Sequence, residues 1–164
     1  MAIPNKILPG FSASLYCQPS ASPTPLTTSQ LALVASVSPI AISGNLLPVE
    51  AIPAFGQDDA VASFGVAGSR QSDKIPVQSA PTSMTITAAW NPSDANLLLM
   101  RGDAYSGIVD RTFVVAATDG TNIIYYAFNG RVSQFQIDPA PGAEAKCTFT
   151  VHPRGNQYGW SNNA

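Results

Sequence analysis

The chain has 164 residues and a mass of 17.1 kDa, a size that suits one domain with its own hydrophobic core. Charged residues make up only 11% of the sequence, against about 25% in an average soluble domain. The formal net charge of −2 argues against nucleic-acid binding, which needs an excess of Lys and Arg.

This shortage of charge also bears on the surface of the protein. Lys and Glu are depleted at protein interfaces, so the composition favours a chain that buries much of its surface in partners. The alternative is a monomer whose surface is mostly Ser, Thr, Asn and Gln. The N-terminal sequence MAIPNKILPG has no basic segment followed by an apolar one, and we expect no signal peptide. Prolines and a glycine interrupt the apolar residues 31–55, so we expect no membrane span.

The first half of the chain has few regular patterns. Residues 1–30 are rich in Pro, Ser and Thr, which predicts an extended N-terminal arm. Residues 46–55 resemble a strand whose two prolines favour an edge or a bend. Residues 56–81 form a long connection that holds more than a quarter of the charges of the chain. We expect this connection to be either a solvated flexible hairpin or an arm that becomes ordered against another subunit.

The sequence TITAAWNPSDANLLLMRG predicts a strand followed by a short helix. Apolar residues alternate from Met84 to Trp90, as in a half-buried strand. Asn91 suits an N-cap, Pro92 suits the first helical position, and Gly102 suits the end of the helix. These signals predict a helix over residues 92–101.

Four strands in meander order are predicted after the helix. Asp119-Gly120 and Asn129-Gly130 are typical of tight turns between strands, and KCTFTV forms the last strand. The segments TFVVAA and NIIYYAF are apolar on both faces, so both faces must be covered. Residues 31–152 then make a mainly β domain of antiparallel strands with one flanking helix. Residues 153–164 are expected to be an exposed or partner-docked tail.

The sequence offers little catalytic or metal-binding chemistry. The only histidine, His152, lies on the polar side of the last predicted strand, away from any nucleophile motif. The pair Asp58-Asp59 is too small for a metal site, so we expect no cofactor and no metal. Cys17 and Cys147 are expected to be buried free thiols. The protein is therefore not predicted to be an enzyme.

The order of elements over residues 80–152 resembles the tail tube proteins of long, flexible-tailed bacteriophages. The resemblance rests on TAAWNP before a short helix, RTFVV, the turn TDGT, FNGRVS and a final KCTFTV. It implies a β-sandwich or small barrel that assembles into hexameric rings, which stack into a hollow tube in the phage tail. It also implies assembly in the host cytoplasm, a tape-measure protein in the bore, tail terminator and distal tail proteins as partners, and later passage of DNA.

The same resemblance suggests which residues meet other subunits. The long connection is the candidate bridging element, with contacts expected from Asp58, Asp59, Arg70, Asp73 and Lys74. A polar, nearly uncharged face is the candidate lining of the bore, with Thr85, Thr87, Gln134 and Gln136.

The predicted helix adds a further expectation. With Ala95, Leu98 and Leu99 on its own sheet, Leu97 and Met100 remain for an adjacent subunit. Three other functions stay open from sequence: a capsid decoration protein, a tail-completion protein and, in a different class, a carbohydrate-binding β-sandwich that would use Tyr158 and Trp160.

Overall fold

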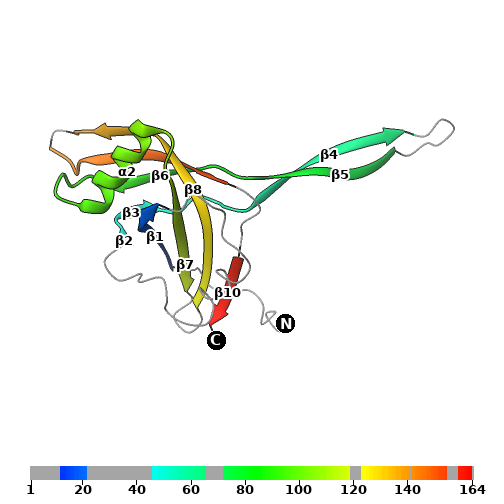
Figure 1. Cartoon of the computed structure of the whole chain (residues 1–164), viewed down its shortest axis with the longest axis horizontal. Helices are drawn as coiled ribbons and strands as arrows, with labels where there is room; N and C mark the ends of the chain where they lie inside the picture. The colour runs from blue at the N-terminus through cyan, green and yellow to red at the C-terminus, as the bar shows by residue number, and fades with distance from the viewer. Residues whose placement is uncertain are drawn as a thin grey trace, which may run out of the picture.

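The computed structural model describes residues 12–21, 46–65, 72–118, 123–140, 142–154 and 159–163. These residues form one eight-stranded antiparallel sheet, a separate two-stranded hairpin and one helix (Figure 1), which confirms the mainly β prediction. In chain order the elements are β1 (Ser12–Ala21), β2 (Leu46–Leu47), β3 (Val49–Ala51), β4 (Gln57–Gly65), β5 (Ser72–Pro81), β6 (Met84–Ala89), α2 (Ala95–Ser106), β7 (Asp110–Thr118), β8 (Ile123–Asp138), β9 (Lys146–Pro153) and β10 (Gly159–Asn163).

The large sheet has the strand order β2-β1-β7-β8-β9-β6-β3, and β10 also pairs with β8. Its path has two ends and is not a closed barrel. The end strands, β2 and β3, are consecutive in the chain and are separated only by Pro48. This proline has no N–H for a ladder hydrogen bond, but its carbonyl accepts one from the N–H of Ala89 at 2.9 Å. The bend predicted from the prolines thus joins opposite ends of one curved sheet.

The long strand β8 organises the sheet. Its first part pairs with β7 and β10, and its second part pairs with β9. The prediction of a turn at Asn129-Gly130 is wrong, because β8 runs straight through both residues. A Cβ at Gly130 would lie 2.8 Å from Val151 Cγ1 and 3.1 Å from Phe113 Cδ2, so close packing, not a turn, accounts for this glycine. The Asp119-Gly120 turn lies outside the described residues.

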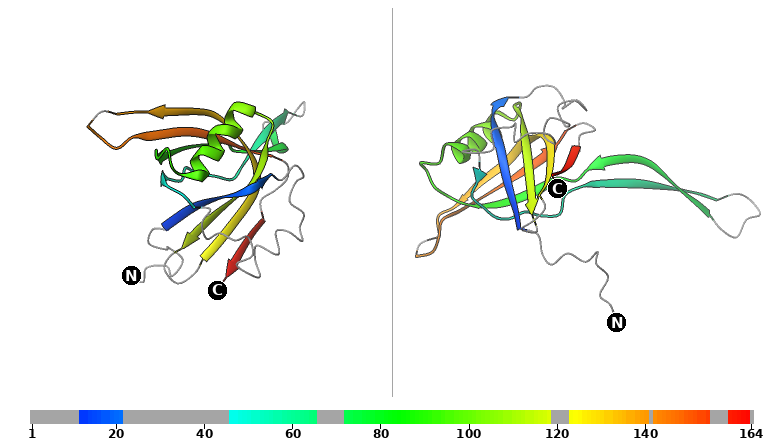
Figure 2. Two further views of the ribbon diagram at one scale, coloured as in Figure 1. Left: turned by 60° about the vertical axis from the view of Figure 1, so that its left-hand side comes forward. Right: turned by 90° about the horizontal axis from the view of Figure 1, so that it is seen from below.

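Both ends of the chain contribute strands that the sequence pattern did not reveal. β1 lies within the predicted N-terminal arm and pairs with β2 and β7. β10 lies within the predicted tail and extends the sheet beside β8 (Figure 2). Leu15 and Cys17, both fully buried, do alternate with more polar neighbours. That signal is two residues long, however, and the surrounding Ser and Pro residues obscure it.

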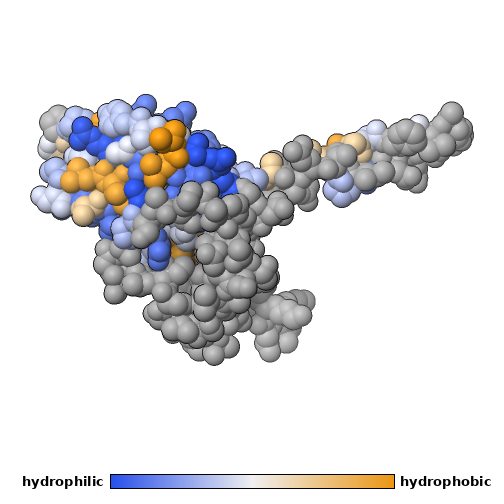
Figure 3. Space-filling view, viewed as in Figure 1, coloured by the Kyte–Doolittle hydropathy of each residue, from blue (hydrophilic) through white to orange (hydrophobic). Residues whose placement is uncertain are grey.

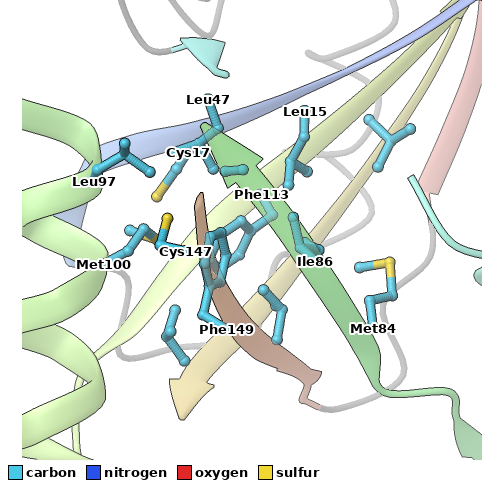
Figure 4. Close-up of a cluster of buried hydrophobic side chains, with 14 of the residues drawn as sticks. Leu15, Cys17, Leu47, Met84, Ile86, Leu97, Met100, Phe113, Cys147 and Phe149 are labelled. Atoms are coloured by element: carbon cyan, nitrogen blue, oxygen red, sulfur yellow. The ribbon is translucent and has the colours of Figure 1, made fainter. Parts of the chain in front are cut away.

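The core fills the space between the sheet and α2 (Figure 4). Two pairs of aromatic rings stack within it, Phe113 on Phe128 at 5.7 Å and Phe135 on Phe149 at 5.9 Å between centroids. Val114 is fully buried like its neighbour Val115. Successive side chains in a strand point to opposite faces, so β7 is covered on both sides there, as its sequence predicts.

Candidate functional site

The face of the sheet opposite the core is lined by uncharged polar side chains over β6, β9 and the second half of β8. Cross-strand pairing sets Thr85 beside Thr150 and Thr87 beside Thr148, and Thr148 also pairs with Gln136. Residues paired across antiparallel strands point to the same face. We call this surface the polar face; it consists of Thr85, Thr87, Ser133, Gln134, Gln136, Thr148, Thr150 and His152.

A β-bulge shapes the polar face in β8. The register with β9 shifts between Ser133 and Gln136, and Gln134 has a φ of 55°, a left-handed conformation that is uncommon outside glycine. The Thr150 hydroxyl donates to Gln134 Oε1 at 3.3 Å, which holds this side chain over the same face. The structure thus brings together Thr85, Thr87, Gln134 and Gln136, the four residues expected on one polar surface.

His152 is exposed and lies between the hydroxyls of Ser133, in the polar face, and Ser83, just before β6. The oxygen of Ser83 is 2.8 Å from its Nδ1, and that of Ser133 is 2.7 Å from its Nε2. Each hydroxyl can donate or accept, so the pair can satisfy either tautomer of the ring. The described residues contain no group of three or more His, Cys, Asp or Glu side chains able to hold a metal ion.

Ion pairs lie at both ends of the polar face and leave its centre uncharged. At one end the Asp110 carboxylate accepts a hydrogen bond from Arg131 Nε at 2.8 Å and another from Arg154 Nη1 at 3.4 Å. At the other end Lys146 donates to Glu50 at 2.7 Å, and this bond raises the pKa of Lys146 above its ordinary value. The centre of the face therefore presents hydroxyl, amide and imidazole groups, whereas the end at Asp110 keeps a net positive charge because two arginines share one carboxylate.

The long connection forms the antiparallel hairpin β4–β5, which extends away from the body (Figures 1 and 2). Among the strands that the structure describes, β4 and β5 pair only with each other, from Gln57 opposite Pro81 to Gly65 opposite Ser72. Of the expected contacts, Asp58 and Asp59 lie in β4, Asp73 and Lys74 lie in β5, and Arg70 lies outside the described residues. The structure therefore gathers four of the five on one projecting arm.

The helix differs from its prediction in position and in the face that it buries. Asn91 caps a turn, with the Ser93 N–H donating to Asn91 Oδ1 at 2.9 Å, while Asp94 is the N-cap of α2. The helix continues through Gly102 and ends at Gly107, whose φ is 65°. No helix among the described residues is long and apolar enough to cross a membrane.

The prediction that Leu97 and Met100 contact another subunit is wrong. Both side chains are fully buried and point from α2 into the core beside Cys147 (Figure 4). Leu98, assigned to the sheet from sequence, is instead 43% exposed. The four consecutive apolar residues 97–100 gave no periodicity from which the buried face could be chosen.

A buried ion pair anchors the far end of α2. Asp103 accepts two bonds from the Arg111 guanidinium, one from Nη2 at 2.9 Å and one from Nε. Arg111 also donates to the carbonyl of Pro19, so one side chain ties α2 and β7 to β1. The hydrogen bond to Asp103 raises the pKa of Arg111. The Arg-Gly-Asp triplet at residues 101–103 thus places its aspartate inside the protein.

No protein-family model and no curated protein matches the chain. Solved structures share its fold at low sequence identity. A chain of the sheath/tube terminator of the extracellular contractile injection system PVC, in its extended state, has a TM-score of 0.64 and 11% identity over 96% of this chain and 99% of that one.

A chain of the six-fold symmetrised baseplate of the anti-feeding prophage has a TM-score of 0.60 and 9% identity, over 98% of this chain and 97% of that one. A chain of the PVC sheath-tube complex in its extended state has a TM-score of 0.55 and 11% identity, over 96% and 93%. The chain therefore has the fold of proteins found in phage-tail-like injection systems.

Proposed function

We propose that the chain is a structural subunit of a tail tube, in which copies form hexameric rings that stack around a bore. The main support for this proposal is the projecting hairpin β4–β5, because among the described strands β4 and β5 pair only with each other. A two-stranded hairpin is marginally stable by itself in water. An arm of this kind gains stability when it lies against another subunit, as it does between the subunits and rings of a tube.

The polar face suits the lining of such a bore. It offers Thr85, Thr87, Gln134 and Gln136 at its centre, and the cations that could hold the phosphates of DNA lie in ion pairs at its ends. Since phosphate binding depends on Lys and Arg, DNA would pass this surface without being retained. The partners of the tube would be the tape-measure protein, the tail terminator and the distal tail proteins, in a virion assembled in the host cytoplasm.

Two kinds of tail could use this subunit. The sequence motifs favour the tubes of flexible-tailed phages, whereas the solved structures of similar fold come from contractile systems.

A second candidate function is a tail terminator, a single ring that closes the tube. The TM-score of 0.64 to a chain of a sheath/tube terminator structure favours it. A terminator would use the same ring contacts but would not stack repeatedly.

Electron microscopy of the purified protein at rising concentration tests the proposal. A tube subunit should give hexameric rings and tubes of uniform width, whereas rings that never stack would favour the terminator. A monomer at every concentration, even with tail initiation components added, would contradict both functions.

A shortened hairpin tests the role of the arm. Asp59 pairs with Ser79, so residues 60–78 can be replaced by Asn-Gly, a sequence that closes a tight hairpin in the same register. The variant should keep a cooperative thermal unfolding transition and lose stacking. Tubes of normal length from this variant would show that stacking uses another element.

A further inference from the structure

The outward side of α2 exposes a cluster of large side chains. Leu98 is 43% exposed and Tyr105 76%, and just beyond the helix Ile108 is 75% exposed. Arg101 lies over the Tyr105 ring, with Cζ 5.8 Å from the centroid. Leu98, Arg101, Gly102 and Tyr105 follow the spacing of one helical stripe. We call these four residues and Ile108 the α2 patch; Figure 3 shows apolar residues gathered over this part of the body.

Gly102 is unexplained by the fold of its own chain. It lies inside the helix, its φ is not positive, and a Cβ there would have nothing within 4 Å. Glycine in an exposed helix interior is unfavourable relative to alanine. Its benefit is the absence of a side chain, which lets another backbone approach the helix closely. Between Leu98 and Tyr105 the helix backbone is thus left without a side chain over it, and we call this open position the notch.

The charge of the α2 patch indicates what could fill this notch. Among the described arginines, Arg101 alone forms no ion pair, and the one nearby carboxylate in the helix, Asp103, is buried against Arg111. The strands of the hairpin carry three aspartates and one lysine (Asp58, Asp59, Asp73 and Lys74). They also expose Val61, which is 55% accessible. With Arg70 included, the arm over residues 57–81 therefore has a net charge of −1 and exposes Val61, whereas the patch combines the cation of Arg101 with apolar side chains.

The two surfaces lie at opposite ends of the molecule (Figure 1), so a chain cannot seat its own hairpin on its own α2 patch. We propose that the α2 patch of one copy receives the β4–β5 hairpin of a second copy. This inference rests on the proposed function and adds the docking site of the arm. A contact between different surfaces of identical chains propagates into a ring or a filament. Two α2 patches facing each other would instead bring Arg101 against its own copy.

Photo-crosslinking identifies the occupant directly. Tyr105→p-benzoylphenylalanine places a crosslinker in the α2 patch of the assembled protein, and mass spectrometry of the digested product locates the partner peptide. We expect crosslinks between two copies that map to residues 57–81. Crosslinks to any other segment, or none above the level of the unassembled protein, would overturn this docking site while leaving tube assembly intact.

A substitution at Gly102 separates folding from assembly. Gly102→Gln should raise the melting temperature by about 1–3 °C, because it improves helix propensity without a clash. It should also raise the concentration needed for assembly at least tenfold, since the side chain fills the notch. The matched control is Ile137→Gln, a change at an apolar residue 40% exposed outside the patch. Equal assembly by Gly102→Gln and wild type would refute the proposal.

A mixing experiment tests the polarity of the contact. The shortened-hairpin chain keeps its α2 patch, and Gly102→Gln keeps its hairpin, so neither should polymerise alone at the concentration at which the wild type assembles. Mixed together, they should form a 1:1 complex by analytical ultracentrifugation. The absence of this complex, with wild type assembling normally, would show that hairpin and patch do not meet.

Discussion

Gly130 provides a test of the packing at the centre of the sheet. It lies in β8 between β7 and β9, and a Cβ there would be 2.8 Å from Val151 Cγ1 and 3.1 Å from Phe113 Cδ2. Ordinary contacts between carbon atoms lie at about 3.5–4.0 Å, so the neighbours would have to move by roughly 0.5–1 Å. Both are fully buried, and neither can swing into solvent.

From these contacts we expect Gly130→Ala to lower the free energy of unfolding by about 2 kcal/mol, within the range of overpacked cores. In a domain of this size the melting temperature would fall by roughly 4–8 °C. Urea unfolding and thermal melts followed by circular dichroism measure both quantities. Gly102→Ala is the matched control, because the same change meets no neighbour there and should stabilise by about 0.5–1 kcal/mol.

A second substitution identifies the clash. Val151→Ala removes the Cγ1 atom nearest the new Cβ, so Gly130→Ala should cost about 1 kcal/mol less in that background than in the wild type. The reasoning would be refuted if Gly130→Ala and Gly102→Ala had equal stability, or if Val151→Ala left the cost of Gly130→Ala unchanged.

Three further predictions concern the core. Leu97→Ala should lower the free energy of unfolding by about 2–5 kcal/mol and Leu98→Ala should change it by no more than about 0.5 kcal/mol, because Leu97 is buried and Leu98 is exposed. Equal losses of stability in urea unfolding would contradict the assignment of Leu97 to the buried face of the helix. Asp103→Asn should lower the free energy of unfolding by about 3–5 kcal/mol, since it leaves the Arg111 guanidinium without its anion. In a double-mutant cycle, Asp103→Asn combined with Arg111→Leu should lower this free energy by less than Asp103→Asn alone. Burial raises the pKa of Cys17 from 9.0 to about 12, so the folded chain keeps a proton that the unfolded chain loses above pH 9. Stability should therefore fall from pH 9 toward pH 12, by up to about 4 kcal/mol, and Cys17→Ala should show a flatter profile in denaturation at pH 8 and pH 10.5.

The local patterns of the sequence were sufficient for several elements. Alternation from Met84 to Trp90 predicted β6 and its buried face, and the buried thiols and the two-sided burial of β7 were also confirmed. Alternation named four uncharged residues of the polar face in advance, Thr85, Thr87, Gln134 and Gln136, whereas Ser133 shares that face only because of the bulge in β8. These successes share a cause, since a strand with one buried face needs a period of two.

Other features depended on partners distant in the chain. Asn91 and Asp94 are both good N-caps, and Gly102 and Gly107 both suit a helix end, so local chemistry alone could not place α2. The choice between Leu97 and Leu98 for the core follows from how the helix meets the sheet. β1 and β10 became strands because β7 and β8 offered them unpaired edges, a condition that no short stretch of sequence records.

The sequence by itself thus determined a mainly β domain, a helix near residue 95, a charge-poor composition and a long connection that holds more than a quarter of the charges. Only the tertiary structure decided that Pro48 joins both ends of one sheet, that Gly130 is a packing residue, and that Gly102 lies open in an exposed apolar stripe. The physical reason is that a glycine suits a turn, a helix end or a close contact equally well, and a proline suits either an edge strand or a bend. Which of its properties is used depends on the neighbours that the fold brings to it.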